Sequence, residues 1–423
     1  MISGANSIYA VDNDVIASMS DPSGPIDMNS IIGNLKKRRD NIINGGVNCI
    51  PLKFNRFRQE VPGIEKSQYV VITANEKTGK TQIASFIYLY SSLEYAFEHK
   101  DQCSVHIIYF ALEESISKIK ERYMCYLLYM LDGKRISPTD LRSTSAEYPI
   151  PEDILALLET ERYQERLRFF DECVQFETEN TNPTGILRVC ENYMKSVGKY
   201  NTHKTKSKSD PSREVDVFDS YVQNDPNHYV IGIIDHIGLA DKEQGFNTKA
   251  TLDKVSEYAV KYMRNRYGMT FVAIQQQASD SQGLEAIKQK RMVPTVATLS
   301  DSKYTARDAD LVLGLFDPSK FGLPSWLGYK ISDGLKSYAR FLYVIANRNG
   351  EMGGVCPLFF DGAVCYFEEL PQPTETQSLQ RFYDKVQEIK SYRQQRKLSA
   401  LTLLFLAKYG RKSSTTSKKK RRR

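Results

Sequence analysis

Short apolar runs recur along the chain and alternate with longer amphipathic stretches. An apolar run between polar residues predicts a buried strand, whereas apolar residues at helical spacing predict a helix with one covered face. Strands that alternate with helices indicate an α/β fold with a mainly parallel central sheet flanked by helices. The predicted strands are residues 70–73, 105–112, 229–235, 269–275, 311–316 and 340–346, and the predicted helices include residues 82–94, 116–131 and 251–267.

The pattern changes at both ends of the chain. The N-terminus is polar and rich in turn residues, and a short amphipathic helix separates it from the first strand. The C-terminus is helical, basic and amphipathic, and it ends in a run of Lys and Arg that we expect to be disordered. The predicted division is a flexible arm (1–27), a linker helix (28–46), the core domain (47–370), a short helical extension (371–410) and a disordered basic tail (411–423).

Three stretches of the core domain are less regular. Residues 203–213 are charged and predict a loop that either lacks order or contacts phosphate. Residues 152–168 have a helical pattern. Residues 356–360 and 363–367 predict a hairpin around Asp361-Gly362.

Composition narrows the class of protein. The 423 residues are 41% hydrophobic, which is enough for a substantial core, yet no apolar run is long enough to predict a membrane span. We expect no secretory signal, because the N-terminal residues lack a basic stretch followed by an apolar one. The seven cysteines are scattered without zinc-like spacing. We therefore expect reduced thiols and a cytoplasmic location. The net charge of +7 is concentrated in the tail, which either contacts nucleic acid or an acidic partner or only aids solubility.

The strand at residues 70–73 leads into a loop that ends in Gly79-Lys80-Thr81, and a helix follows. This order is that of a P-loop, in which backbone N–H groups and a Lys bind phosphates and a Thr hydroxyl binds Mg²⁺. The first Gly of the usual pattern is Ala74 here, and the alternative is a surface turn with an exposed Lys. The predicted nucleotide-binding residues are Ala74, Asn75, Glu76, Lys77, Thr78, Gly79, Lys80, Thr81 and Gln82.

Two acidic positions follow predicted strands. Asp235 ends the run 229–235 and fits a Walker B acid that holds the Mg²⁺ shell together with Thr81. Glu113 follows the strand 105–112 and is the candidate general base, with Glu114 as its rival. Both glutamates also suit the start of the helix that follows, and Asp235 alone also suits a turn.

Gln276 and Arg348 also lie at strand ends. Gln276 is a candidate sensor of the γ-phosphate, or only a polar residue that leaves a strand. Arg348 precedes a Gly turn and is a candidate arginine finger for a neighbouring subunit, or only an exposed turn residue. Because ligands of parallel sheets bind at the carboxyl ends of the strands, we expect the P-loop, Glu113, Asp235 and Gln276 to converge there.

In order and spacing, these blocks resemble the ATPase domain of DnaB-like replicative helicases, which are hexameric RecA-fold proteins. The resemblance implies a RecA-like P-loop NTPase core, and in that family Ala is common at the position of Ala74. It also implies that Glu113 is the catalytic base, Asp235 the Walker B acid, Gln276 the sensor and Arg348 the finger. The six matching blocks are TANEKTGKT (73–81), YFALEE (109–114), IIDHIGL (233–239), AIQQQ (273–277), LSDSKYTARDADLVL (299–313) and VIANRNG (344–350).

At two places, this chain lacks a cation that the family has. Ala346 stands where the family has a Lys two residues before the finger. Ser300-Asp301-Ser302-Lys303 stands where the family has Arg-Glu-Ser-Gly in a DNA-binding loop, so Lys303, or the nearby cations, would have to contact DNA phosphates instead. These nearby cations are Lys288, Lys290 and Arg291. The family's N-terminal helical domain has no counterpart, which would suit a phage-encoded protein acting in its host's cytoplasm.

The resemblance implies a helicase driven by ATP and Mg²⁺ that forms a homo-oligomeric, hexameric ring on single-stranded DNA. Central loops within residues 277–309 and 241–248 would grip the strand, and a primase or loader would be a partner. The first alternative is a RecA-fold DNA-binding ATPase that does not unwind DNA, which Ala346 and Ser300 favour. The second is a nucleic-acid binder that acts through its tail and keeps a vestigial nucleotide site.

Overall fold

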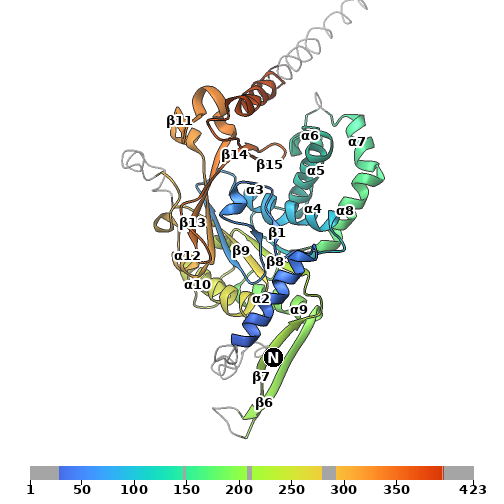
Figure 1. The fold of residues 1–423 in the computed structure, drawn as a ribbon, viewed down its shortest axis with the longest axis vertical. Coiled ribbons are helices and arrows are strands. Elements are labelled where there is room, and N and C mark those ends of the chain that lie inside the picture. Colours follow the sequence, from blue (N-terminus) through green and yellow to red (C-terminus); the bar gives the residue numbers. More distant parts are fainter. Residues whose placement is uncertain (1–27, 146–148, 207–211, 279–291, 393, 395–423) are drawn as a thin grey trace, which may run out of the picture.

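The computed structural model describes residues 28–145, 149–206, 212–278, 292–392 and 394. The predicted arm, the basic tail and residues 395–410 of the predicted extension lie outside the described residues. A nine-stranded sheet crosses the described part of the chain, and helices cover both of its faces (Figure 1).

The sheet joins a parallel part to an antiparallel edge. Its strands are β3 (Tyr69–Ala74), β4 (Ser104–Ala111), β5 (Val174–Glu177), β8 (His228–Asp235), β9 (Thr270–Gln276), β10 (Leu311–Phe316), β13 (Ala339–Asn347), β14 (Val355–Asp361) and β15 (Tyr366–Glu369). Their order is β15-β14-β13-β10-β3-β9-β8-β4-β5. From β10 to β5 neighbouring strands are parallel, and β13, β14 and β15 add an antiparallel edge. All residues of the central strand β3 are buried, as expected where helices cover both faces.

Two apolar layers hold the helices to the sheet. One face packs against the helix that follows β3 and against the helices between β4 and β5, and the other face packs against three helices with no member in the first layer. The first set is α3 (Lys80–Ala84), which continues through a π-helical turn (Ser85–Tyr90) into α4 (Ser91–Glu98), with α5 (Ile116–Asp132), α6 (Pro138–Leu141), α7 (Glu152–Glu159) and α8 (Glu161–Cys173). The second set is α9 (Pro183–Ser196), α10 (Thr248–Tyr258) and α12 (Tyr304–Asp308).

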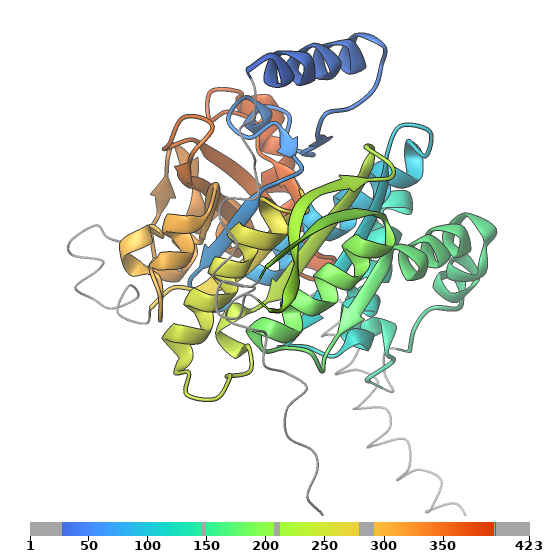
Figure 2. The same cartoon turned by 90° about the horizontal axis from the view of Figure 1, so that it is seen from below.

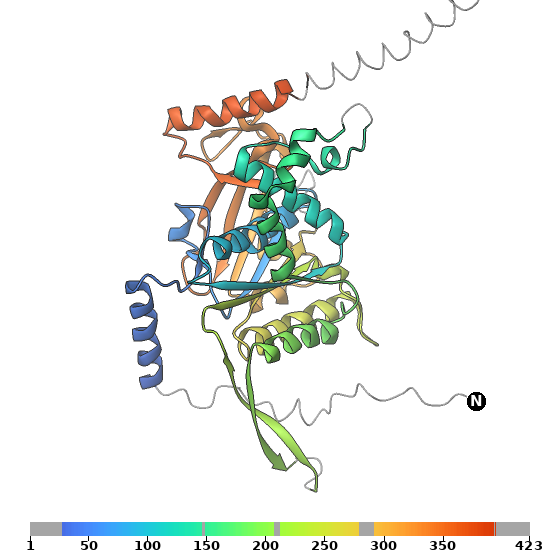
Figure 3. The same cartoon turned by 90° about the vertical axis from the view of Figure 1, so that its right-hand side faces the viewer.

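A third apolar cluster lies at the antiparallel edge. The helix over residues 376–392 buries Leu379, Phe382 and Val386 against strand residues that include Phe341 and Phe359. Figure 3 shows this helix lying across the end of the molecule, beyond the strands of the antiparallel edge. The described part of the predicted extension therefore packs onto the core domain. Two short strand pairs lie outside this sheet, β1 (Ile50–Pro51) with β2 (Gly63–Ile64) and β11 (Ser325–Trp326) with β12 (Tyr329–Lys330).

Two elements project from the body. Helix α2 (Met28–Ile43) stands away from the sheet, as the views in Figures 2 and 3 show. The hairpin of β6 (Gly198–Lys206) and β7 (Glu214–Gln223) extends from the same end of the molecule. Several apolar side chains of α2 are exposed: Met28, Ile31, Ile32, Leu35, Ile42 and Ile43.

The predicted fold class, an α/β fold with a mainly parallel central sheet flanked by helices, is confirmed. Three local predictions need correction. Of the predicted loop 203–213, residues 203–206 belong to β6, residues 212 and 213 precede β7, and residues 207–211 lie outside the described part; the strand was missed because β6 is mainly polar and shows no apolar alternation. The predicted helix 152–168 is two helices that meet at Thr160, and the β14–β15 turn is residues 362–365 rather than a two-residue turn. None of the described helices is both long and apolar enough to cross a membrane.

Candidate functional site

The P-loop follows β3 and ends where α3 begins. Gly79 has a φ of +105° and precedes the first residue of α3. A Cβ at this position would also lie 3.2 Å from the Phe360 ring, so both the backbone and the neighbouring ring favour glycine. The loop thus places the first N–H groups of a helix beside a cavity, as phosphate binding requires.

Four predicted residues meet at the carboxyl ends of β3, β4 and β8. The Nζ atom of Lys80 lies 3.4 Å from a carboxylate oxygen of Glu113. The hydroxyl of Thr81 donates a hydrogen bond of 3.0 Å to Asp235. Lys80 is buried, whereas the Glu113 side chain is 43% exposed and reaches the cavity. The parallel pairing of β4 with β8 sets Ala111 opposite Asp235 and so brings the acids together.

Asp235 is the most electrostatically perturbed acid of this group. Burial raises its pKa to about 6, and the nearby Glu113 carboxylate adds to the rise, while Lys80 and hydrogen bonds from Thr81 and Tyr109 oppose it. A buried carboxylate that is costly to ionise gains from a bound cation. One hydroxyl and one carboxylate are also oxygen donors of the kind that Mg²⁺ prefers when phosphates and water supply its other ligands. The donor set therefore fits Mg²⁺ held through Thr81 and Asp235.

Arg122 was missed by the sequence analysis. It projects from α5 and forms a bidentate ion pair with Glu114, and both side chains are largely buried. This pair also raises the pKa of Arg122. Because Glu114 is engaged by Arg122 while Glu113 is not, the structure favours Glu113 as the acid that can turn to a water molecule. Arg122 follows Glu113 by nine residues, and nothing in the sequence marks it as a site residue except its place on the inner face of α5.

A second missed group holds the P-loop from behind. Arg340, on β13, donates a hydrogen bond of 2.7 Å to the carbonyl of Thr78 and forms an ion pair of 3.1 Å with Asp317. The side chains of Arg340 and Asp317 are 7% and 4% exposed. Lys320 adds hydrogen bonds to the Glu76 carbonyl and to the Thr78 hydroxyl. We call Arg340, Asp317 and Lys320 the P-loop clamp.

The three glutamines at the end of β9 have different surroundings. Gln276 lines the P-loop cavity, whereas Gln275 and Gln277 are buried. The Gln275 amide donates to the carbonyls of Ser300 and Ser302 and accepts from the Thr305 hydroxyl. Gln275 therefore connects the strand to the segment that leads into α12. The predicted phosphate contacts Lys288, Lys290 and Arg291 lie outside the described residues.

Arg348 does not join the other predicted residues. Its backbone N–H donates to the carbonyl of Asp310, and the Asp310 carboxylate accepts from the N–H of Tyr69. Tyr69 begins β3, so Arg348 lies at the amino ends of the parallel strands. A six-residue strand spans about 20 Å, which separates Arg348 from the P-loop of the same chain. Its side chain is half exposed and donates to the Arg307 carbonyl.

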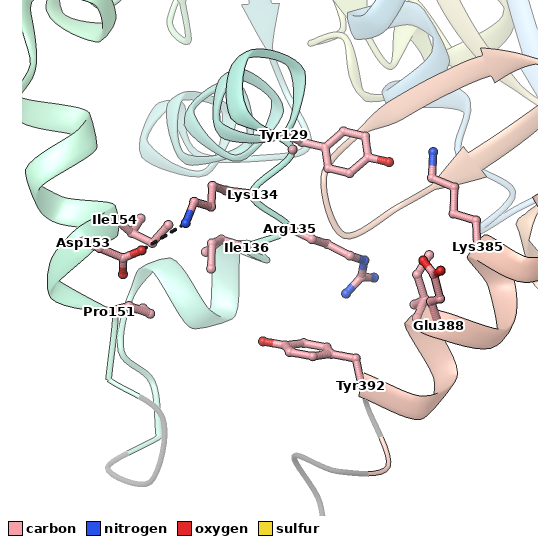
Figure 4. Close-up of a pocket in the computed structure, with 12 residues that line it drawn as sticks. Tyr129, Lys134, Arg135, Ile136, Pro151, Asp153, Ile154, Lys385, Glu388 and Tyr392 are labelled. Atoms are coloured by element: carbon pink, nitrogen blue, oxygen red, sulfur yellow. Dashed lines mark hydrogen bonds and ion pairs between the residues drawn. The ribbon is translucent and has the colours of Figure 1, made fainter.

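The P-loop cavity has a volume of about 700 Å³ and is lined by polar side chains from the loop, from Glu113, Glu114 and Arg122, and from Gln276. A second cavity of about 500 Å³ lies between the end of α5, α7 and the helix 376–392 (Figure 4). Its three cations each have an acidic partner: Lys134 with Asp153, Arg135 with Asp361, and Lys385 with Glu368. The P-loop cavity is the better candidate for a phosphate ligand, because the loop places the first N–H groups of a helix beside it.

Comparisons with known proteins give the fold alone. No family model matches the chain, and no curated protein matches it. Among solved structures, an isolated ATPase domain matches with a TM-score of 0.55 and 14% identity, over 82% of this chain and 100% of that chain. A DnaB-like replicative helicase, described with its interactions with primase, matches with a TM-score of 0.57 and 14% identity, over 82% of this chain and 69% of that one. The chain therefore has the fold of these ATPase domains.

Proposed function

We propose that this chain is an ATP-dependent DNA helicase of the DnaB-like class. It would hydrolyse ATP with Mg²⁺ between subunits of a homo-oligomeric, hexameric ring and move along single-stranded DNA to separate a duplex. One observation carries the proposal: Lys80, Thr81, Glu113 and Asp235 lie at the carboxyl ends of the parallel strands, whereas Arg348 lies at their amino ends. An arginine finger in that position can complete a site only in an adjacent subunit.

The residues at the cavity suit phosphoryl transfer. Lys80 can contact the β- and γ-phosphates, and the N–H groups of the loop can bind the same phosphates. Glu113 can orient and deprotonate the attacking water. Its neighbour Glu114 is less suited to this role, because it is held by Arg122. Mg²⁺, bound through Thr81 and Asp235, would neutralise phosphate charge. Gln276 lines the same cavity and can contact the γ-phosphate.

Assembly into a ring is supported by α2 and Arg348. The exposed apolar residues of α2, such as Ile32 and Leu35, have no cover within the described chain. An exposed apolar helix that stands off the body suits docking on an adjacent subunit. DNA would then pass along the segments 241–248 and 277–309, and a primase or loader protein is a further partner that the DnaB-like neighbour suggests.

The first test is nucleotide hydrolysis with and without single-stranded DNA. We expect Lys80→Ala to abolish turnover and Glu113→Gln to lower it by about 10²- to 10⁴-fold. Lys118→Ala and Glu159→Gln, at exposed positions of α5 and α7, should leave it unchanged. Strand displacement on a forked duplex and particle size in the presence of an ATP analogue complete the test. If Lys80→Ala and Glu113→Gln both retain wild-type turnover, the site is wrongly assigned.

A DNA-binding RecA-fold ATPase that does not unwind DNA, such as a recombination mediator, loader or packaging protein, is the second candidate. Ala346 lies on β13 where the resemblance leads us to expect a second trans-acting cation. The hydroxyl and N–H of Ser300 both donate to the Gln276 carbonyl, so this position ties the loop to β9 rather than offering a cation to DNA. Hydrolysis stimulated by DNA without strand displacement would favour this candidate.

A further inference from the structure

We propose that Tyr304, flanked by Lys249 and Arg307, is a stacking site for one base of single-stranded DNA. The inference rests on the proposed function, because it names the side chains that would contact the strand. Tyr304 is the first residue of α12 and is 47% exposed. Tyr304 and Tyr392 are the two aromatic residues whose exposure is this high within the described chain.

Tyr304 lies where two distant segments of the chain meet. Lys249 is at the start of α10, directly after the segment 241–248, and Tyr304 lies within the segment 277–309. Ser256 of α10 donates a hydrogen bond of 2.8 Å to Asp308 of α12. The Ser302 hydroxyl donates in turn to Asp253 of α10. These bonds hold α12 against α10, beside the two segments that the resemblance to DnaB-like helicases assigns to DNA.

The side chains around Tyr304 suit a nucleotide unit. The Lys249 Nζ atom lies 5.4 Å from the centre of the Tyr304 ring, and the Arg307 Cζ atom lies 5.2 Å from it. All three side chains are exposed, so a ligand can reach them. An aromatic ring beside cations is the usual arrangement for single-stranded nucleic acid, because the ring stacks on a base while the cations contact phosphates. Asp301 is the exposed acid nearby in the sequence, and Lys303 is a further exposed cation.

Stacking of a base on the Tyr304 ring is stronger than the interaction of the ring with Lys249 or Arg307. A cation at an exposed ring contributes a factor of about 2 to 5 in an equilibrium constant. Stacking of one base contributes a factor of about 5 to 150. A base can therefore replace a cation on the ring of Tyr304, and the displaced Lys249 or Arg307 becomes available to a neighbouring phosphate. The buried neighbours Thr305 and Ala306 keep the backbone below the ring in place.

The test uses fluorescence anisotropy to measure binding of a labelled oligo-dT to the full chain in the presence of a non-hydrolysable ATP analogue. We expect Tyr304→Ala to raise the Kd by about 5- to 150-fold, Tyr304→Phe to stay within about twofold because the ring remains, and Tyr392→Ala to match wild type. The slope of log Kd against log salt concentration should be unchanged in Tyr304→Ala and smaller by about 1 in Lys249→Ala. The circular dichroism spectrum and the urea unfolding midpoint of Tyr304→Ala should match wild type, which would exclude loss of the fold.

The outcomes separate this inference from the proposed function. If wild type binds the oligonucleotide and Tyr304→Ala binds as tightly, the stacking site is wrong while the proposed function stands. If Tyr304→Phe loses as much affinity as Tyr304→Ala, the ring does not act by stacking, and the inference fails in the same way. If wild type hydrolyses ATP but binds no oligonucleotide in any nucleotide state, the proposed function itself fails.

Discussion

The P-loop clamp makes a quantitative prediction about stability. Arg340→Met keeps much of the volume of the side chain but removes the charge and all of its donors. The Asp317 carboxylate would then be buried without its cation, and the Thr78 carbonyl would lose its donor. Breaking a buried ion pair by removing one partner costs about 3–5 kcal/mol. Ser319 still donates two hydrogen bonds to Asp317, so we expect the lower end, about 3 kcal/mol.

A double-mutant cycle identifies the source of that cost. Asp317→Asn alone leaves Arg340 buried without a counter-charge, although its hydrogen bonds to the carbonyls of Ser337 and Ala339 remain. In the double variant neither charge is left unpaired. We therefore expect it to be more stable than the sum of the single changes by about 1–3 kcal/mol, the range typical of residues in one network.

The chain carries its own probe for this measurement. Its single tryptophan is Trp326, whose ring lies 5.0 Å from that of Phe316, the residue before Asp317. Urea unfolding followed by Trp326 fluorescence therefore reports on the region of the clamp. The matched control is Arg381→Met, because Arg381 is 65% exposed and its ion pair with Glu368 should contribute at most about 1 kcal/mol.

Nucleotide affinity gives an independent readout of the clamp. Loss of the bond from Arg340 to Thr78 would free the loop that we propose binds the phosphates, and we expect the Kd for a fluorescent ATP analogue to rise about tenfold. The reasoning is refuted if Arg340→Met costs less than about 1 kcal/mol, or if the costs of the two single changes simply add. It is also refuted if Arg340→Met lowers stability and leaves nucleotide affinity unchanged, because the clamp would then support the fold and not the loop.

Three further predictions concern the site itself. Glu113→Gln should lower ATP turnover by about 10²- to 10⁴-fold, and Glu114→Gln should lower it less, as steady-state hydrolysis rates will show. Asp235→Asn should stabilise the nucleotide-free chain by up to about 3 kcal/mol at pH 7.5, because the carboxylate with a pKa of about 6 is ionised there at a cost. That gain should shrink as the pH falls below 6 and disappear near pH 4, and an unchanged gain across pH would contradict the burial argument; urea unfolding at several pH values measures it. Arg348→Ala and Lys80→Ala should each be inactive alone and recover hydrolysis when the two proteins are mixed, whereas a mixture that stays inactive would argue against a finger acting between subunits.

The parallel core and its strand ends could be predicted from the sequence because they depend on local patterns. Buried runs such as 229–235 are visible as apolar stretches, and the rules of parallel sheets place their carboxyl ends together. This is why Lys80, Glu113 and Asp235 converge as the sequence analysis expected. The same reasoning could not find Arg340 or Asp317, because a buried charged pair depends on contacts between residues far apart in the chain.

The β6–β7 hairpin and the role of Gln275 were missed for different physical reasons. Strand β6 is exposed along most of its length and is mainly polar, so it carries no apolar alternation. Gln275 lies beside Gln276 in a run of three glutamines, and the sequence does not tell which of them faces the cavity and which is buried. Only the twist and pairing of β9 with β3 decide this.

Within one subunit, the short helix α12 and the residues just before it have contacts at both ends of the parallel strands. At its start, Gln275 binds the carbonyls of Ser300 and Ser302 beside the P-loop cavity. At its end, the Arg307 carbonyl accepts a hydrogen bond from Arg348, at the edge that would face a neighbour. Because α12 is only five residues long and is bonded at both ends, we expect a displacement at one end to shift the other. In a ring, the position of each finger would therefore depend on the nucleotide in its own subunit, and Tyr304, on the same helix, would add the DNA strand to that connection.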